Sequence, residues 1–153
     1  MNILYCGDKN IEKGLIISCL SLLKHIDEKL NIYVLTINFD QKRTGSKLIE
    51  PVTDKCIEAL NNRVKEKNLE NFVKKIDITD LFEKEIPHQN MKTHFTPCCM
   101  LRLFADEIEE MPNKILYLDT DVVCRQNFSE FYHQDMKDVE FARCFRLLWK
   151  MVF

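Results

Sequence analysis

The sequence contains few glycines and prolines, the residues that are abundant in fibrous and low-complexity chains. Its 153 residues include only three glycines and four prolines, which excludes a collagen-like segment or a low-complexity linker. Hydrophobic residues make up 46% and charged residues 30%, the composition of a globular domain rather than a disordered chain. The formal net charge of -2 supplies no basic field that would attract nucleic acid. We therefore expect one domain, or part of one, with a real core and no nucleic-acid partner.

Long apolar runs and leader-like segments are also missing. The longest apolar stretch, Gly14–Leu23, is too short and too interrupted to span a bilayer. We therefore expect no transmembrane segment and, at most, peripheral contact with a membrane. The chain begins with a strand-like segment and has no basic leader followed by a cleavable apolar core. Together these features predict a cytoplasmic location.

The cysteines and histidines show none of the usual metal or redox spacings. No CxxC pair is present, the number of cysteines is odd, and several of them lie within apolar runs. We expect them to be reduced and mostly buried, because a thiol commonly packs as a small core residue. No HxxxH or HxH spacing supports His88, His94 or His133 as metal ligands, so these are expected in loops or on the surface.

Strand-like and helix-like segments alternate along the chain. Strands are expected at Asn2–Cys6, Asn31–Thr36, Asn71–Ile78 and Lys114–Leu118. Helices are expected around the apolar stripe of Leu15, Ile16, Cys19, Leu20, Leu22 and Leu23, at 46–67 with an interruption at Pro51, and at 96–108, where Thr96 and Pro97 suit a helix start. Between them we expect a turn at Asp80–Phe82 and a loop at Ile86–Phe95. This alternation predicts an α/β fold with right-handed crossovers and a mostly parallel sheet.

The most informative segment is Lys114–Val123, in which an apolar run ends abruptly in two carboxylates, Asp119 and Asp121. Read as a buried strand, it delivers both side chains to the carboxyl end of the sheet, where open α/β folds bind ligands. In an extended chain, alternate side chains point the same way, so both carboxylates would face one small volume. Such charges repel unless a cation lies between them, and hard divalent ions prefer oxygen ligands. The segment indicates a metal-assisted site for a phosphate-bearing ligand.

The loop Gly7–Asn10 is a second candidate, because it lies between the first strand and the first helix. A helix start offers free N–H groups to a ligand, and Asp8 and Asn10 could hydrogen-bond a base or a ribose. The alternative is that these two side chains simply cap the turn and the helix.

Arg102 and the pair Cys98–Cys99 lie in the expected helix at 96–108. A guanidinium among apolar residues suits a phosphate or carboxylate partner, but a surface arginine with its stem along the apolar face fits equally well. A helix start could lower the pKa of a thiol, but the sequence shows no partner base, so packing is preferred for the cysteines.

Several of these segments together resemble glycosyltransferase family 8, which holds the bacterial lipopolysaccharide galactosyl- and glucosyltransferases and the glycogenins. The segments that carry the resemblance are Ile3–Asn10, Phe95–Pro97, Leu101–Leu103, Lys114–Asp121 and Phe128–Tyr132. The order and spacing match from Met1 to about Phe141, and Leu-Tyr-Leu-Asp-Thr-Asp at 116–121 is the most specific part.

The resemblance implies a Rossmann-like nucleotide-sugar domain of the GT-A type, a UDP-sugar donor and Mn²⁺ (or Mg²⁺) as the cofactor. It implies transfer of the sugar, with retention of configuration, to a cell-surface glycan or a lipopolysaccharide-type acceptor. Asp119 and Asp121 would hold the metal. The other donor-binding positions would be Cys6, Gly7, Asp8, Asn10, Arg102 and Thr120, with Asp119 again.

The chain departs from the family pattern at two places. Ile11 stands where relatives commonly have an aromatic residue that stacks on uracil. The family's histidine metal ligand and its acceptor-binding residues lie beyond the end of this sequence. We expect residues 1–142 to be the donor-binding part of a truncated, inactive transferase. We expect 143–153 to be an aberrant tail, out of frame after a frameshift near Ala142–Arg143.

Two other interpretations remain open. Haloacid-dehalogenase-like phosphatases also place a DxD motif after an apolar strand, although usually near the amino terminus and with the first aspartate as the nucleophile. The third interpretation is non-enzymatic: a remnant that binds nucleotide or that does not fold stably, because a missing strand would expose a sheet edge.

Overall fold

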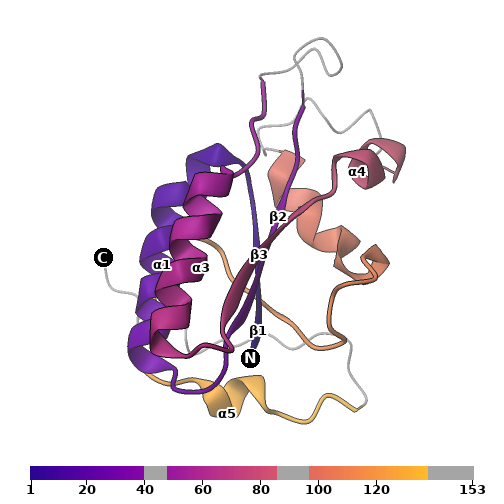
Figure 1. Ribbon diagram of the computed structural model, residues 1–153. Coiled ribbons are helices and arrows are strands. Elements are labelled where there is room, and N and C mark those ends of the chain that lie inside the picture. Colours follow the sequence, from indigo (N-terminus) through magenta and orange to yellow (C-terminus); the bar gives the residue numbers. More distant parts are fainter. Residues whose placement is uncertain (40–47, 86–96, 138–153) are drawn as a thin grey trace.

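The computed structural model describes residues 1–39, 48–85 and 97–137 (Figure 1). Its sheet contains four strands in these ranges: β1 (Asn2–Cys6), β2 (Asn31–Thr36), β3 (Phe72–Asp77) and β4 (Leu116–Tyr117). They lie in the order β3-β2-β1-β4, and each neighbouring pair is parallel. This confirms the predicted α/β fold with a parallel sheet.

Helices cover both faces of the sheet. In Figure 1, α1 (Glu12–His25) and α3 (Asp54–Lys67) lie side by side on one face. The short helix α4 (Thr79–Glu85) and the 3-10 helix η3 (Pro97–Glu107) lie on the other. Two short helices complete the described elements, η1 (Lys9–Ile11) directly after β1 and α5 (Ser129–Tyr132) near the end of the described chain.

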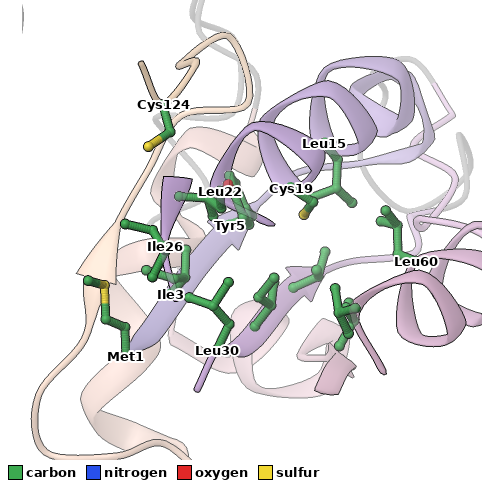
Figure 2. Packing of buried hydrophobic residues seen from close by; sticks show 14 of the residues in the cluster. Met1, Ile3, Tyr5, Leu15, Cys19, Leu22, Ile26, Leu30, Leu60 and Cys124 are labelled. Atoms are coloured by element: carbon green, nitrogen blue, oxygen red, sulfur yellow. The ribbon is translucent and has the colours of Figure 1, made fainter. Parts of the chain in front are cut away.

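The central strands divide their side chains between two apolar clusters. Ile3 and Tyr5 of β1 pack with α1 and α3, whereas Leu4 packs with α4 and η3. Figure 2 shows the first cluster, in which Leu15, Cys19 and Leu22 of α1 lie over the sheet. This alternation follows from strand geometry, because successive side chains leave opposite faces of a sheet.

The predicted bounds of β1 and β2 are confirmed, and the stripe on α1 is confirmed for four of its six residues, with Leu23 partly buried against the first cluster. Leu15, Cys19 and Leu22 are buried as expected. Ile16 and Leu20 are exposed instead. The buried stripe includes Ser18, whose hydroxyl lies 2.7 Å from the Tyr5 hydroxyl. A hydrogen-bonded serine can therefore take a core position that an apolar pattern does not reveal.

The expected helix at 46–67 was too long. Residues 48–53 are not helical: Ile49 forms an antiparallel bridge with Phe39, and Val52 N–H donates to the Thr36 hydroxyl at 3.0 Å. The helix α3 begins only at Asp54, after Thr53, whose side chain accepts a hydrogen bond from the Cys56 amide. This is an ordinary N-cap, and it fixes where the helix starts.

The turn expected at Asp80–Phe82 is a helix, α4. Asp77 accepts a hydrogen bond from the Thr79 amide at its start, at 2.9 Å. Phe82 is fully buried against the rings of Phe39 and Phe104, with centroid distances of 5.5 and 5.3 Å. Tertiary burial of one aromatic side chain stabilises this short helix where local propensity does not indicate one.

The segment expected as an α-helix at 96–108 is a 3-10 helix from Pro97 to Glu107. Its buried residues include Cys98, Leu101 and Phe104, which recur every third position. A helix with three residues per turn places them on one face, which an α-helix would spread over a wider arc.

The strand β4 is shorter and less buried than expected. It spans two residues, and the side chains of 115–118 are half-buried. The carbonyl of Lys114 accepts hydrogen bonds from the Asn2 side-chain amide and the Tyr132 hydroxyl, at 3.0 and 3.2 Å. Just before β4, side chains therefore supply the hydrogen bonds that the backbone of a neighbouring strand would otherwise make. No strand flanks β4 on its outer side within 1–39, 48–85 and 97–137, which leaves its side chains partly exposed.

Some predictions lie outside the described residues. These are the loop at Ile86–Phe95, the capping role of Thr96, and the tail with its proposed frameshift near Ala142–Arg143. The division into 1–142 and 143–153 therefore stays a prediction. Among the helices that the structure describes, none has the length and apolar character needed to cross a membrane.

Candidate functional site

The candidate site lies where the chain leaves β1 and β4, two neighbouring parallel strands. The Gly7 amide continues the ladder to Leu35 of β2 at 3.0 Å, and the Leu118 amide continues it to Leu4 of β1 at 3.0 Å. The residues that follow each strand therefore emerge at the same edge of the sheet. From β1 the chain proceeds to β2 on one side, while β4 lies on the other side. Such a switch point is where open α/β sheets bind ligands.

The loop Gly7–Asn10 is held by its own side chains. Asp8 Oδ1 accepts a hydrogen bond from the Asn10 backbone amide at 2.9 Å, and its Oδ2 accepts one from the Asn10 side chain at 3.1 Å. The Lys9 amide donates to the Glu50 carbonyl at 2.8 Å. Asp8 therefore caps η1, and the Asn10 side chain bonds to this cap from within η1, so the capping alternative holds for Asp8. Both residues also lie near the carboxyl ends of β1 and β4, where the candidate site is. Capping does not exclude a contact with a ligand, so their binding role stays a prediction.

Asp119 and Asp121 lie at this edge with exposed side chains, but a turn rather than an extended chain joins them. The Val122 amide donates to the Asp119 carbonyl at 3.1 Å, which closes a turn over residues 119–122. Strand alternation predicts that both carboxylates point the same way. That argument was wrong, because the two residues do not lie in one strand. The strand ends at Tyr117, and alternation does not extend through a turn.

The donor set suits a hard divalent ion that shares its coordination with a ligand. Asp119 and Asp121 offer carboxylate oxygens, the ligands that Mn²⁺ and Mg²⁺ prefer. In the part of the chain that the structure describes, no three His, Cys, Asp or Glu residues are grouped closely enough to hold an ion by themselves. Two carboxylates are fewer ligands than Mn²⁺ or Mg²⁺ takes, so an ion bound here would need further oxygen ligands.

Tyr117 connects the carboxylate to the predicted arginine. Its hydroxyl donates to Asp119 Oδ1 at 2.5 Å, and the guanidinium carbon of Arg102 lies 5.0 Å from the centre of its ring. Burial, together with the bond to Asp119, raises the pKa of the Tyr117 phenol, so it remains protonated and a donor at neutral pH. The structure therefore brings Arg102 and Asp119 to the same aromatic side chain.

The thiols near this site are packing groups. Burial raises the pKa of Cys6, although the positive charge of Arg102 opposes the shift. Burial, with a smaller contribution from the charge of Asp8, raises the pKa of Cys98 to about 12. Both thiols are protonated at neutral pH, which makes them poor nucleophiles. For Cys98 this agrees with the preference for packing over reactivity, whereas Cys99 is exposed.

The helix α1 supports the aspartate turn from behind. A Cβ atom built on Gly14 would lie 2.7 Å from the Thr120 carbonyl oxygen, so only a glycine allows this approach. Further along the helix, the Ser21 hydroxyl accepts a hydrogen bond from the Cys124 amide at 2.8 Å and donates one to the Ser18 carbonyl at 2.7 Å. Thr120, predicted to contact the donor, thus has its backbone against α1.

Sequence reasoning missed Tyr117 and Gly14. A signal for Tyr117 was present, because residues 117 and 119 are two apart where the chain is still extended and so share a side. Gly14 gave no signal, since its partner Thr120 is distant in sequence. His133 is exposed and lies 2.8 Å from Glu28, before β2 at the opposite edge of the sheet. It was rightly left out of the site, and His88 and His94 fall outside the described residues.

Comparisons with known proteins place this architecture in a family. A search of curated proteins found no match. Among solved structures, the chain is similar to the active-site mutant Q189E of LgtC, with 21% identity and a TM-score of 0.66. It is also similar to the galactosyltransferase LgtC in complex with donor and acceptor sugar analogues, with 20% identity and a TM-score of 0.65. These likenesses show the fold, which is part of the GT-A fold of LgtC.

The matches cover 90% and 89% of this chain, but only 44% and 43% of those two chains, so the sequence spans less than half the length of these proteins. Residues 2–146 match the family described as Glycosyl transferase family 8. That match covers nearly the whole sequence, including β1, the loop after it, Arg102 and both aspartates. The chain belongs to glycosyl transferase family 8.

Proposed function

We propose that this chain binds the UDP-sugar donor of a retaining glycosyltransferase, with Mn²⁺ or Mg²⁺ held by Asp119 and Asp121. The observation that carries the proposal is the exposed aspartate turn at the edge shared by β1 and β4, in a chain that matches the family over residues 2–146. Transfer to a cell-surface glycan or a lipopolysaccharide-type acceptor is the corresponding proposal for the whole protein.

The residues around the turn have the chemistry that a nucleotide diphosphate requires. A diphosphate is anionic, so the exposed guanidinium of Arg102 supplies a cation with several donors on the η3 side. The loop Gly7–Asn10 presents amide and carboxylate groups to the base and ribose, next to the half-buried Cys6. A divalent ion bound by the aspartates would stabilise the negative charge that develops on the departing diphosphate.

Binding, rather than turnover, is the direct test, because it needs only the described part of the chain. We expect calorimetric titration to show UDP binding that strengthens when Mn²⁺ or Mg²⁺ is present. Asp119→Asn and Asp121→Asn should each remove most of that metal-dependent gain. The loss should exceed the roughly 10- to 100-fold effect of removing an outer-shell partner of a metal ligand.

The matched control is Asp27→Asn. Asp27 makes an ion pair with Lys67 at 3.0 Å, its side chain is 89% exposed, and it precedes β2 at the opposite edge of the sheet. Loss of such an exposed pair changes stability by about 1 kcal/mol or less, and UDP binding should be unchanged.

Absence of metal-dependent UDP binding by a protein that unfolds cooperatively would contradict the proposal. Hydrolysis of a generic phosphoester without any response to UDP would instead support the haloacid-dehalogenase-like alternative. Val123, two places after Asp121, fits that alternative, but the position of the motif deep in the chain and the loop Gly7–Asn10 argue against it.

A further inference from the structure

Tyr117 joins two side chains that were singled out separately. Its hydroxyl donates to Asp119 Oδ1 at 2.5 Å, and its ring lies under the guanidinium of Arg102, 5.0 Å from the guanidinium carbon to the ring centre. The residue belongs to β4, which pairs in register with Ile3 and Leu4 of β1. A sheet position is rigid, so Tyr117 is a fixed point between two exposed charged groups.

We propose that Tyr117 is a positioning residue that sets the orientation of the Asp119 carboxylate toward a divalent ion. This inference rests on the proposed function, since it concerns the same site. The Asp119 side chain is exposed and would otherwise sample several rotamers. A donor on Oδ1 restrains that freedom, while the phenol makes no hydrogen bond to Oδ2. Hydrogen-bonded partners of this kind commonly orient the carboxylate ligands of metals.

The ring has a second, separable effect. A guanidinium over an aromatic face is attracted by the ring's negative π surface, which restrains a long and otherwise mobile side chain. Arg102 is exposed and lies on η3, whereas Asp119 follows β4. Tyr117 therefore holds a cation and an anion from two elements at a set separation. The hydroxyl acts on Asp119 and makes a weaker hydrogen-bonding interaction with Arg102, and the ring acts on Arg102.

Tyr117→Phe tests the hydroxyl alone, because it retains the ring. We expect the Mn²⁺-dependent part of UDP affinity to fall about 10- to 100-fold, as for other outer-shell partners of metal ligands. UDP affinity measured without metal should fall much less, because only the weaker interaction of the hydroxyl with Arg102 is then lost. Tyr117→Leu removes the ring as well, and it should also weaken UDP binding in the absence of metal, through Arg102.

The control is Tyr132→Phe, which removes the same atom elsewhere. The Tyr132 hydroxyl accepts from the Asn2 amide at 3.1 Å and donates to the Lys114 carbonyl at 3.2 Å, before the start of β4. This variant should lower the melting temperature without changing the metal-dependent gain in UDP affinity.

A spectroscopic measurement tests the same contact in the unaltered protein. The four tyrosines can be labelled at Cζ and observed by NMR while Mn²⁺ is added. The signal of Tyr117 should broaden first, because its hydroxyl touches a ligand of the paramagnetic ion. Tyr5 is buried between the sheet and α1, and Tyr132 lies beyond the other end of β4.

Each outcome distinguishes this role from the proposed function. If the unaltered protein binds UDP with Mn²⁺ and Tyr117→Phe does so equally well, the positioning role is wrong and the proposed function stands. If Tyr117→Phe weakens UDP binding equally with and without metal, the hydroxyl is structural, and the role is again wrong. If the unaltered protein binds neither UDP nor Mn²⁺, both proposals fail together.

Discussion

At the scale of the residue, Gly14 sets helix propensity against close packing. Replacing a glycine inside a helix by alanine usually stabilises the helix by about 1 kcal/mol. Here the added Cβ would lie 2.7 Å from the Thr120 carbonyl oxygen, and backbone cannot move away as a flexible side chain can. The sign of the effect therefore depends on which of these two terms is larger.

We expect Gly14→Ala to destabilise the protein by about 1–3 kcal/mol, as overpacking commonly does, despite its better propensity. Hydrogen exchange should also quicken at the Val122 and Cys124 amides, whose hydrogen bonds hold the aspartate turn. Ala59→Gly, at an exposed position of α3, measures propensity alone in the same protein. A higher melting temperature for Gly14→Ala would contradict this expectation. It would show that the turn at residues 119–122 can move away from the added methyl group without a loss of stability.

Individual residues also show how far sequence reasoning reaches at the site. The apolar run before Asp119 correctly indicated that this carboxylate follows a strand, at the carboxyl end of β4. It did not indicate the turn that takes Asp121 out of the extended chain, because a turn of Asp, Thr, Asp and Val has no glycine or proline to mark it. Arg102 was identified by its chemical type, but its partner Tyr117 became evident only when η3 and β4 were placed together.

At the scale of the element, the junction of α3, β2 and β3 depends on one buried side chain. Asn71 is 1% exposed and immediately precedes β3. Its Oδ1 accepts from the Leu30 amide at 2.8 Å, before β2, and its Nδ2 donates to the Val64 carbonyl of α3 at 3.0 Å. The side chain thus satisfies one backbone group just before β2 and another on α3.

We expect Asn71→Ala to destabilise the protein by about 1–3 kcal/mol, because it leaves the buried Leu30 amide without its partner, while the Val64 carbonyl keeps the Asn68 amide. Denaturant unfolding measures the loss. Asn62→Ala, at an exposed position on α3, should change stability by less than about 0.5 kcal/mol. Equal losses for the two variants would contradict the role given to Asn71.

The elements differ in how well their bounds could be predicted. For β1 and β2, the apolar run and the strand have the same limits, because both lie centrally in the sheet with helices over each face. Local pattern was insufficient for α4 and η3. Burial of Phe82 stabilises α4. The buried side chains of η3 recur at every third residue, which distinguishes it from an α-helix. Both depend on contacts with segments that are distant in sequence.

At the scale of the whole molecule, the sheet joins two apolar clusters into one folding unit. The side chains of β1 and β2 alternate between the cluster under α1 and α3 and the cluster under α4 and η3. If the helices on one face of the sheet unfolded, the strands would lose packing contacts and then the backbone hydrogen bonds between them. The packing on the other face would be lost as well. The two clusters should therefore unfold together, which is the behaviour expected of a small single domain.

Leu22→Ala and Phe82→Ala test this coupling from opposite faces of the sheet. Leu22 is 1% exposed on α1 and Phe82 is 0% exposed on α4, so each truncation leaves a cavity and should destabilise the protein by about 2–5 kcal/mol. Far- and near-ultraviolet circular dichroism should record one shared transition in each variant, shifted to lower temperature. Leu69→Ala, at a side chain that is 86% exposed, should leave the transition almost unchanged. Two separate transitions in either truncation would show instead that the faces fold independently, and the aspartate turn, which lies against α1, would then depend on only one of them.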